Sequence, residues 1–201
     1  GSELATGNMS TQPLAWLNGD IKLKNVLKNW FFVFIGNVIG SLFVAYFFAS
    51  ISGILAAEPQ ASYIVNLANN KINLNWFEAF WRGVGCNWLV GIAIWMSFAT
   101  DSLIGKVIAV WWPIMTFVAI GFEHSIANTF FVPAGLFIGN SASYTGTVLN
   151  AGWQTFIVKN LIPVTLGNVV GAVVFVSLTG WYLYSYKSHK KVVKKGLRES
   201  A

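Results

Sequence analysis

The chain contains 201 residues, of which 55% are hydrophobic and only 10% are charged. A typical soluble domain carries about 25% charged residues, so the composition predicts an all-α membrane protein. The formal net charge of +6 does not indicate a nucleic-acid partner, because no basic stripe is interleaved with aromatic side chains. The single cysteine, Cys86, excludes an internal disulfide and a cysteine-based metal site, and we expect no cofactor or metal.

Apolar runs define the predicted elements in chain order. The opening segment, Gly1 to about Leu17, is too short for a membrane crossing. Trp30–Ala57, Phe77–Ala99 and Asn160–Tyr186 are each long enough for a full crossing, which needs about 20 predominantly apolar residues. We therefore expect a single transmembrane channel domain over residues 1–186.

One further crossing is predicted to be broken. Lys106–Ile120 and Thr129–Ile138 are each too short to span a bilayer alone, and they flank the polar segment Gly121–Asn128. That segment places Glu123 and His124 between two strongly apolar runs. Ionisable residues at membrane depth are costly and by default mark an ion path or a proton relay.

Basic residues predict the orientation. If the spans alternate, Lys106, the lysines of Ile21–Lys28 and the basic tail at residues 187–201 fall on one side. The basic residues on the other side are Lys71, Arg82 and Lys159. The side with the excess is cytoplasmic. We therefore expect a multi-pass protein of the plasma (inner) membrane, with a cytoplasmic C-terminal tail that contacts anionic lipid.

An internal repeat relates the two halves of the chain. Gly1–Asn8 matches Gly121–Asn128 at its glycine, glutamate and asparagine. The later matches are Lys28-Asn29 with Lys159-Asn160 and Gly36–Gly40 with Gly167–Gly171. An odd number of crossings separates the copies, which predicts inverted halves, about 1–57 and 77–186, with a site where their breaks meet.

The second copy contains elements that the first does not. Phe77–Ala99 and Lys106–Ile120 precede its polar segment, whereas the sequence starts at Gly1 in the first copy. We therefore expect the complete protein to have an earlier full span and the first half of another broken helix before Gly1. The full-length reading frame tests this expectation.

Three side chains near the breaks are candidates for chemistry. Glu3 and Glu123 can each accept several N–H bonds, so we interpret both as supports of non-helical backbone, with an electrostatic effect on His124 as the alternative. His124 has no histidine at the matching position, where Leu4 stands. Its imidazole can titrate near neutral pH, and half-helix N-termini add positive potential, which favours anions.

Smaller polar residues complete the candidate site. Thr6 can hydrogen-bond the imidazole and fix its tautomer, or it is an ordinary small residue at a tight turn. Asn87 and Asn128 can donate to an anion, or they serve as interhelical hydrogen-bond donors and a helix cap. The glycine pairs of the repeat have a spacing that allows close helix packing.

Three stretches of the sequence resemble the formate/nitrite transporter family. They are Gly121–Asn128, the span with Cys86-Asn87 and Trp95-Met96, and Leu161–Asn168. The resemblance covers essentially the whole chain. It implies an aquaporin-like six-helix protomer with inverted three-helix repeats and two broken helices, assembled as a homopentamer with a pore in each protomer.

The resemblance also implies roles for individual residues. His124 would lie between two apolar constrictions, close to Thr6, and form the proton relay. Leu4 and Ala5 would line the cytoplasmic constriction, although the family often has phenylalanine where Ala5 stands, and Phe117 would line the periplasmic one. The other matched positions are the pore-lining Asn87, Val90 and Asn128 and a vestibule lysine, Lys71.

The leading hypothesis is passage of small monovalent weak-acid anions, with formate first and nitrite or hydrosulfide as alternatives. Proton transfer from His124, directly or through water, would let a neutral acid cross the apolar constrictions. The expected partners are therefore formate or a similar anion, protons and the lipid bilayer. Lys71 would draw anions to the pore, or it is a plain surface lysine.

Two hypotheses from other classes remain. An aquaporin-like channel for water or neutral solutes would use the same half-helix architecture. A membrane-embedded enzyme is not favoured, because the sequence has no metal-ligand cluster, nucleophile elbow or phosphate-binding loop.

Overall fold

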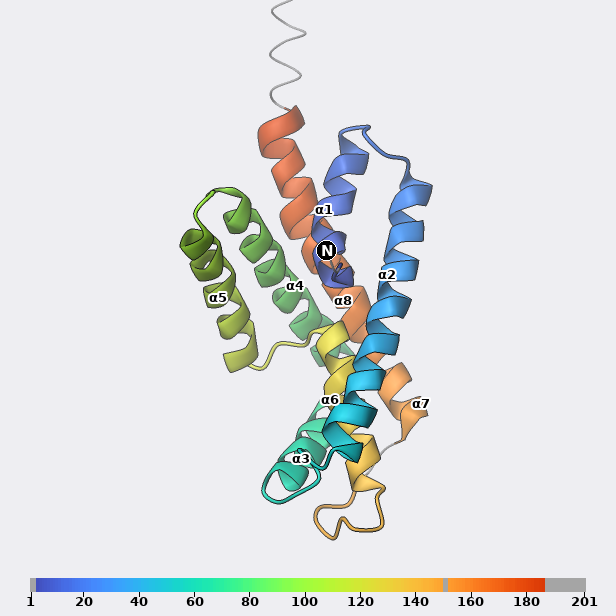
Figure 1. Cartoon of the computed structure of the whole chain (residues 1–201). Helices are drawn as coiled ribbons and strands as arrows, with labels where there is room; N and C mark the ends of the chain where they lie inside the picture. The colour runs from blue at the N-terminus through green and yellow to red at the C-terminus, as the bar shows by residue number, and fades with distance from the viewer. Residues whose placement is uncertain (1–2, 150–151, 187–201) are drawn as a thin grey trace, which may run out of the picture.

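The computed structural model describes residues 3–149 and 152–186, and all regular elements in these ranges are helices (Figure 1). The predicted basic tail, 187–201, lies outside the described residues. Two of the helices are long and apolar enough to cross a membrane. They are Leu23–Ile51, with 29 residues, and Trp153–Tyr186, with 34 residues, and each has a mean hydropathy of 2.1.

The first half pairs a short helix with a long one. α1 (Ala5–Leu17) ends before Gly19, whose φ of 86° is a left-handed conformation that favours glycine. The chain then reverses into α2 (Leu23–Phe43), which runs back alongside α1 (Figure 1). α1 therefore has the half-length that was expected for the opening segment.

The long helix is shifted relative to the predicted span Trp30–Ala57. α2 begins before Trp30, because the basic segment ahead of it is rich in good helix formers. It continues as the π-helix η1 (Val44–Ile51) and ends before Gly53, whose φ of 80° again favours glycine. The apolar residues after Gly53 therefore lie outside the helix.

α3 (Gln60–Ile72) is a helix for which no element was predicted. It packs against α6 (Ser125–Gly139) through a buried apolar cluster. Its buried apolar positions follow a helical period, and they are Ala61, Ile64, Val65, Ala68 and Ile72. That spacing is the sequence signal that predicts such a helix.

α4 (Trp76–Phe98) and α5 (Leu103–Ala119) form a helical hairpin close to the predicted bounds (Figure 1). The start of α4 is fixed by a capping box, in which Asn75 Oδ1 accepts the Glu78 N–H at 2.9 Å and Glu78 Oε2 accepts the Asn75 N–H at 3.4 Å. The side chain of Ser102 caps α5 by accepting the Gly105 N–H at 3.3 Å.

α5 and α6 are two halves of one interrupted helix, as predicted. Gly121 has a φ of 75° and turns the chain at the end of α5. His124 is extended, with φ −110° and ψ 114°, and α6 begins directly after it. α6 starts earlier than the predicted Thr129, because Ser125 and Asn128 are buried within its first turn.

The last helix is continuous but irregular. Its parts are α7 (Trp153–Thr155), η2 (Phe156–Leu161), α8 (Ile162–Ala172), η3 (Val173–Leu178) and η4 (Trp181–Tyr186). It starts before the predicted Asn160. Pro163 does not end it, and the π-helical segment η2 lies directly before the turn of α8 that contains this proline.

The glycines of the repeat have different surroundings in the two halves. A Cβ at Gly167 or Gly171 would collide with backbone carbonyl groups of α4, so α8 and α4 are in backbone contact. Gly36 and Gly40 meet no atom within 4 Å in the described part of the chain. The predicted close packing is therefore present at Gly167 and Gly171.

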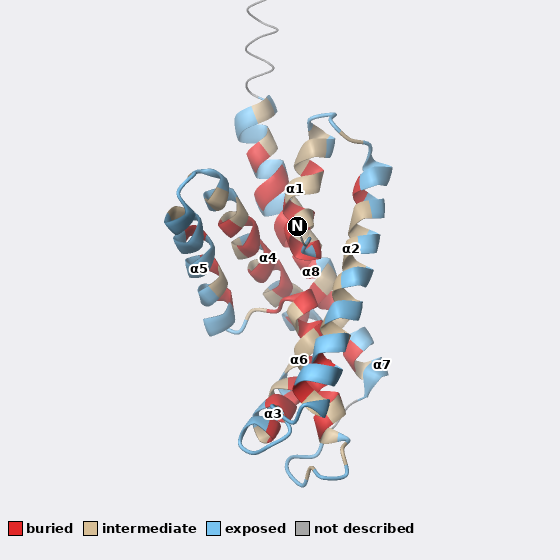
Figure 2. Ribbon diagram, viewed as in Figure 1, coloured by how far each residue is buried: buried red, intermediate tan, exposed pale blue. Residues whose placement is uncertain are grey.

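Buried residues gather where α1, α4, α6 and α8 meet (Figure 2). The outward faces of α2 and α5 instead expose large apolar side chains, among them Phe31, Phe32, Ile39, Leu103 and Ile104. This distribution suits a protein whose outer surface contacts lipid or neighbouring helices rather than water.

Gly171→Ala is expected to lower thermal stability, because the added Cβ would overlap the Val84 carbonyl and separate α8 from α4. Overpacking of this kind costs about 1–3 kcal/mol. Gly152→Ala is the matched control, since a Cβ there meets nothing within 4 Å. Thermal unfolding of the detergent-purified variants measures both effects, and equal melting temperatures would contradict the backbone contact.

Candidate functional site

The first break is held by the carboxylate of Glu3. Its Oε2 accepts hydrogen bonds from Asn8 Nδ2 at 2.6 Å and from Asn29 Nδ2 at 3.0 Å. Asn8 Nδ2 also donates to Asn29 Oδ1 at 2.8 Å, so the three side chains form a closed triangle. Because Asn29 belongs to α2, the triangle ties the break to the long helix that follows.

The second break repeats this triangle with the equivalent atoms. Glu123 Oε2 accepts from Asn128 Nδ2 at 2.6 Å and from Asn160 Nδ2 at 3.1 Å. Asn128 Nδ2 donates to Asn160 Oδ1 at 2.8 Å. The sequence repeat therefore encodes a repeated hydrogen-bond network. In the described residues each carboxylate accepts from side-chain amides rather than from the backbone N–H groups that were expected, so the glutamates tie the breaks to the following helices through asparagines.

A further asparagine in each half binds the backbone of the break. Asn37 Oδ1 accepts the Ala5 N–H at 2.8 Å, and its Nδ2 donates to the Glu3 carbonyl at 3.0 Å. Asn168 makes the equivalent pair of contacts in the second break, with the Ser125 N–H at 2.9 Å and the preceding glutamate carbonyl at 3.0 Å. Asn37 and Asn168 lie within the repeated segments Gly36–Gly40 and Gly167–Gly171. From the sequence, these segments predict only close helix packing.

Lys71 is ion-paired rather than isolated. Its Nζ lies 2.8 Å from Glu123 Oε1, and the two side chains are only 12% and 4% exposed. Its carbonyl accepts a 3.0 Å hydrogen bond from Asn160 Nδ2. Lys71 thus contributes to the support of the second break, and in the described residues Glu3 has no salt-bridge partner of this kind.

His124 connects the two breaks. Its Nε2 lies 2.9 Å from Thr6 Oγ1, and its Nδ1 accepts the Ala127 N–H at 3.0 Å as the N-cap of α6. A ring nitrogen that accepts an N–H carries no proton, so the imidazole is neutral with its proton on Nε2. Nε2–H therefore donates to the Thr6 hydroxyl oxygen, and both side chains are buried.

Asn87 and Asn128 use their amide N–H groups inside the protein. Asn87 Nδ2 donates to the Thr6 carbonyl at 3.2 Å and to the Asn168 carbonyl at 2.8 Å. Asn128 Nδ2 is shared by the glutamate and the asparagine of the second triangle. Both residues are fully buried, and this geometry supports interhelical hydrogen bonding rather than donation to an anion.

Apolar side chains pack against the imidazole on the α5 side. The Phe117 ring is stacked on His124, with centroids 5.7 Å apart and planes inclined by 12°. Val90 and Cys86 belong to the same buried cluster as Phe117. The structure thus brings Phe117 against His124 and Val90 into the apolar cluster of Phe117, and their role in a constriction stays a prediction.

The two residues expected at the cytoplasmic constriction differ in how far their side chains are exposed. Leu4, at the start of α1, is 42% exposed, whereas Ala5 is completely buried. Ala5 is engaged through its backbone N–H, which Asn37 accepts. The side chain of Leu4 is thus exposed and that of Ala5 is not, and the constriction expected from these residues stays a prediction.

Of two cavities near the breaks, one, termed the outer cavity, reaches His124, and the other, termed the inner cavity, does not. The outer cavity, of about 480 Å³, lies beside the second break and is lined by residues that include Lys71, Arg82, Phe117 and His124. The inner cavity, of about 310 Å³, lies between α1, α4 and η3, and its lining includes Leu14 but neither Thr6 nor His124. Arg82 was not among the predicted site residues.

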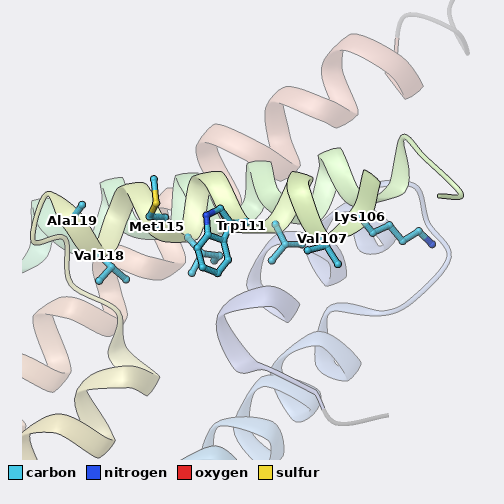
Figure 3. Close-up of a pocket in the computed structure, with 8 residues that line it drawn as sticks. Lys106, Val107, Trp111, Met115, Val118 and Ala119 are labelled. Atoms are coloured by element: carbon cyan, nitrogen blue, oxygen red, sulfur yellow. The ribbon is translucent and has the colours of Figure 1, made fainter. Parts of the chain in front are cut away.

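A larger hollow of about 720 Å³ runs along α5 and is not part of this site. Figure 3 shows that its labelled side chains all come from this one helix. They are Lys106, Val107, Trp111, Met115, Val118 and Ala119. Because the lining is apolar except for Lys106, the groove does not suit an ionic ligand.

Comparison with known sequences finds transporters and channels of one family. The family model described as formate/nitrite transporter matches residues 1–182. A probable formate transporter of Methanothermobacter thermautotrophicus is 42% identical over 198 residues, covering 92% of this chain and 69% of the relative. The formate channel FocA of Haemophilus influenzae is 36% identical over 199 residues, covering 91% and 68%. The formate channel BtFdhC of Bacillus thuringiensis is 34% identical over 192 residues, covering 96% and 69%.

Solved structures give the same fold. A pentameric formate channel with formate bound matches with a TM-score of 0.75 and 35% identity, covering 83% of this chain and 69% of that chain. An FNT family ion channel matches with a TM-score of 0.78 and 35% identity, covering 90% and 69%. The chain thus spans about two thirds of the length of these proteins, which are transporters and channels rather than enzymes.

Asn168→Asp is expected to destabilise the second break. The Asn168 amide donates to the Gly83 carbonyl at 2.8 Å and to the Glu123 carbonyl at 3.0 Å, and a carboxylate has no proton to give to either. We expect a loss of about 2–4 kcal/mol, measured as a lower melting temperature in detergent. Asn66→Asp, on the exposed face of α3, is the control, and a melting temperature as high as that of this control would rule out the role given to Asn168.

Proposed function

Because the chain belongs to the formate/nitrite transporter family, we propose that it passes small monovalent weak-acid anions across a membrane, with formate first. The observation that carries this proposal is the contact of 2.9 Å between His124 Nε2 and Thr6 Oγ1, where the two breaks meet. Relatives named as formate transporters or channels support the same class of substrate.

Electrostatics near this contact favour an anion. α1 begins at Ala5 and α6 at Ser125, so two helix N-termini with partial positive charge lie close to Thr6 and His124. The negative charge of Glu123 is balanced by its lysine partner at 2.8 Å. An anion that reaches the break is therefore attracted by helix dipoles without being repelled by an unpaired Glu123 carboxylate.

The apolar wall beside the contact gives a reason for proton transfer. Phe117 covers one face of the His124 ring, so an anion at this point loses part of its hydration. Burying an unpaired charge costs far more than burying a neutral polar group. We therefore propose that the anion crosses this apolar step as the neutral acid.

The hydrogen bonds of His124 define how a proton can move. Nε2–H donates to Thr6 Oγ1, which leaves the Thr6 O–H free to donate to an anion. Protonation of Nδ1 removes the acceptor that holds the Ala127 N–H. Proton uptake by His124 is therefore coupled to loss of the α6 cap, and the proton reaches the anion directly or through water.

Assembly and orientation follow as further parts of the proposal. Similarity to a solved pentameric formate channel supports a homopentamer with a pore in each protomer. The α1–α2 and α4–α5 connections lie at the same end of the molecule as the end of the last helix (Figure 1). That end carries Lys22, Lys24 and Lys106, so we place it on the cytoplasmic side of the plasma (inner) membrane.

His124→Asn and His124→Phe are expected to separate the two roles of the imidazole. Asparagine is among the best N-cap residues, whereas phenylalanine offers no acceptor, so only His124→Phe is expected to lose about 1 kcal/mol of stability. Neither side chain titrates, so formate flux into proteoliposomes should lose its pH dependence in both variants. Wild-type pH dependence in His124→Asn would disprove the protonic role.

A substrate panel ranks the candidate anions. Formate, nitrite and hydrosulfide fluxes are measured in the same proteoliposomes at two pH values. We expect formate to pass fastest, because the named relatives are formate transporters and channels. A higher flux of nitrite or hydrosulfide would keep the anion pathway and change its principal substrate.

A further inference from the structure

The outer cavity contains one cation whose only ion pair in the described residues is long and exposed. Four of its lining side chains can carry charge, namely Lys71, Arg82, Glu123 and His124. Lys71 and Glu123 neutralise each other at 2.8 Å, and the hydrogen bond accepted by Nδ1 makes His124 neutral. Arg82 remains charged, because an arginine guanidinium does not lose its proton in proteins.

The contacts of the Arg82 guanidinium are weak. Its Nη2 lies 3.9 Å from Glu78 Oε1, and these side chains are 41% and 50% exposed, so their ion pair contributes little. Its Nη1 donates to the Gly121 carbonyl at 3.5 Å, which is at the limit for a hydrogen bond. A guanidinium has five N–H donors in a planar fork, and most of these donors remain available.

Arg82 lies in the cavity through which an anion would reach Phe117 and His124. The Arg82 carbonyl accepts the Glu123 N–H at 3.3 Å, so this turn of α4 is fixed against the second break. Figure 1 shows the connection between α5 and α6 passing beside α4. Arg82, Phe117 and His124 line the same cavity, so an anion at Arg82 is in the cavity that also reaches the Phe117–His124 stack.

We infer that Arg82 forms an anion-binding site at the outer entrance, which holds planar anions with two oxygens before they reach Phe117. The guanidinium fork fits the two oxygens of a carboxylate in a bidentate hydrogen bond, and formate and nitrite both present such a pair. Hydrosulfide has a single sulfur and cannot form it. The site thus favours formate and nitrite over hydrosulfide, and this inference rests on the proposed function.

A purely structural role for Arg82 makes different predictions. A cation near the C-terminal end of α5 also stabilises that helix through its dipole and its free carbonyl groups. Loss of that role alone would lower the melting temperature and the maximal flux. It would leave the half-saturating anion concentration and its dependence on salt unchanged.

The test compares wild type with Arg82→Gln and Arg82→Lys, and uses Lys159→Gln as a control for charge. Lys159 is exposed and is not among the residues that line the outer cavity. Formate and hydrosulfide fluxes are measured in proteoliposomes against anion concentration at low and high ionic strength. Binding of ¹³C-formate to the purified protein is followed by NMR in parallel.

We expect Arg82→Gln to raise the half-saturating formate concentration about tenfold and to flatten its salt dependence. Arg82→Lys should keep the salt dependence but lose the preference for formate over hydrosulfide, because an ammonium ion has no fork. Lys159→Gln should behave as wild type. If Arg82→Gln does not fold, the formate-to-hydrosulfide preference of Arg82→Lys decides alone.

The inference is overturned by an unchanged half-saturating concentration and salt dependence in Arg82→Gln, or by an unchanged preference in Arg82→Lys. Lower maximal flux at unchanged half-saturation would also overturn it, in favour of the structural role. A wild type that binds formate through Arg82 but passes none would reject the proposed function and keep the site. A wild type that passes formate while binding is insensitive to Arg82 would reject the site and keep the function.

Discussion

Non-helical backbone at membrane depth must find its hydrogen-bond partners inside the protein, and the two breaks in this fold depend on that constraint. In each break one asparagine, Asn37 or Asn168, binds backbone N–H and carbonyl groups, and a glutamate with two further asparagines joins the break to the following helix through side-chain hydrogen bonds. The two sets are Glu3 with Asn8, Asn29 and Asn37, and Glu123 with Asn128, Asn160 and Asn168. Because two asparagines of each set come from the following long helix, the breaks are anchored to the body of the fold. This anchoring brings α1 and α6 together at Thr6 and His124.

The two halves differ at the side chains that carry chemistry. His124 stands where the first half has Leu4, and it serves at once as the cap of α6 and as the donor to Thr6. Lys71 stabilises the second carboxylate. With that pair neutralised, Arg82 supplies the positive charge of the outer cavity. The shared network therefore holds the breaks together, and in the proposed function the unmatched residues give the passage its selectivity for anions.

Much of the fold could be predicted from patterns that are local in the sequence. The broken helix follows from a polar segment inside an apolar run, and the inverted halves follow from matched glycine, glutamate and asparagine positions. α3 was missed because it is too short and too polar to resemble a crossing, although its helical period is visible. The start of the last helix was misplaced because the polar pair Lys159-Asn160 interrupts the apolar residues of this helix.

Less of the site than of the fold could be predicted from the sequence. Glu123 and His124 stand out by their polarity, but the ion pair of Glu123 with Lys71 joins residues far apart in the chain, and no spacing rule predicts it. The tautomer of His124 depends on the extended backbone that aims Nδ1 at Ala127. Arg82 looks like an ordinary charge at a helix end until the outer cavity is known.

The central claim is that an anion, rather than water alone, crosses where the two breaks meet. Its most direct test is formate uptake by proteoliposomes containing the purified protein, recorded together with osmotic water permeability at two pH values. The account predicts formate uptake well above that of protein-free liposomes, with a rate that changes with pH. Osmotic swelling accompanied by formate uptake no faster than in protein-free liposomes would contradict it.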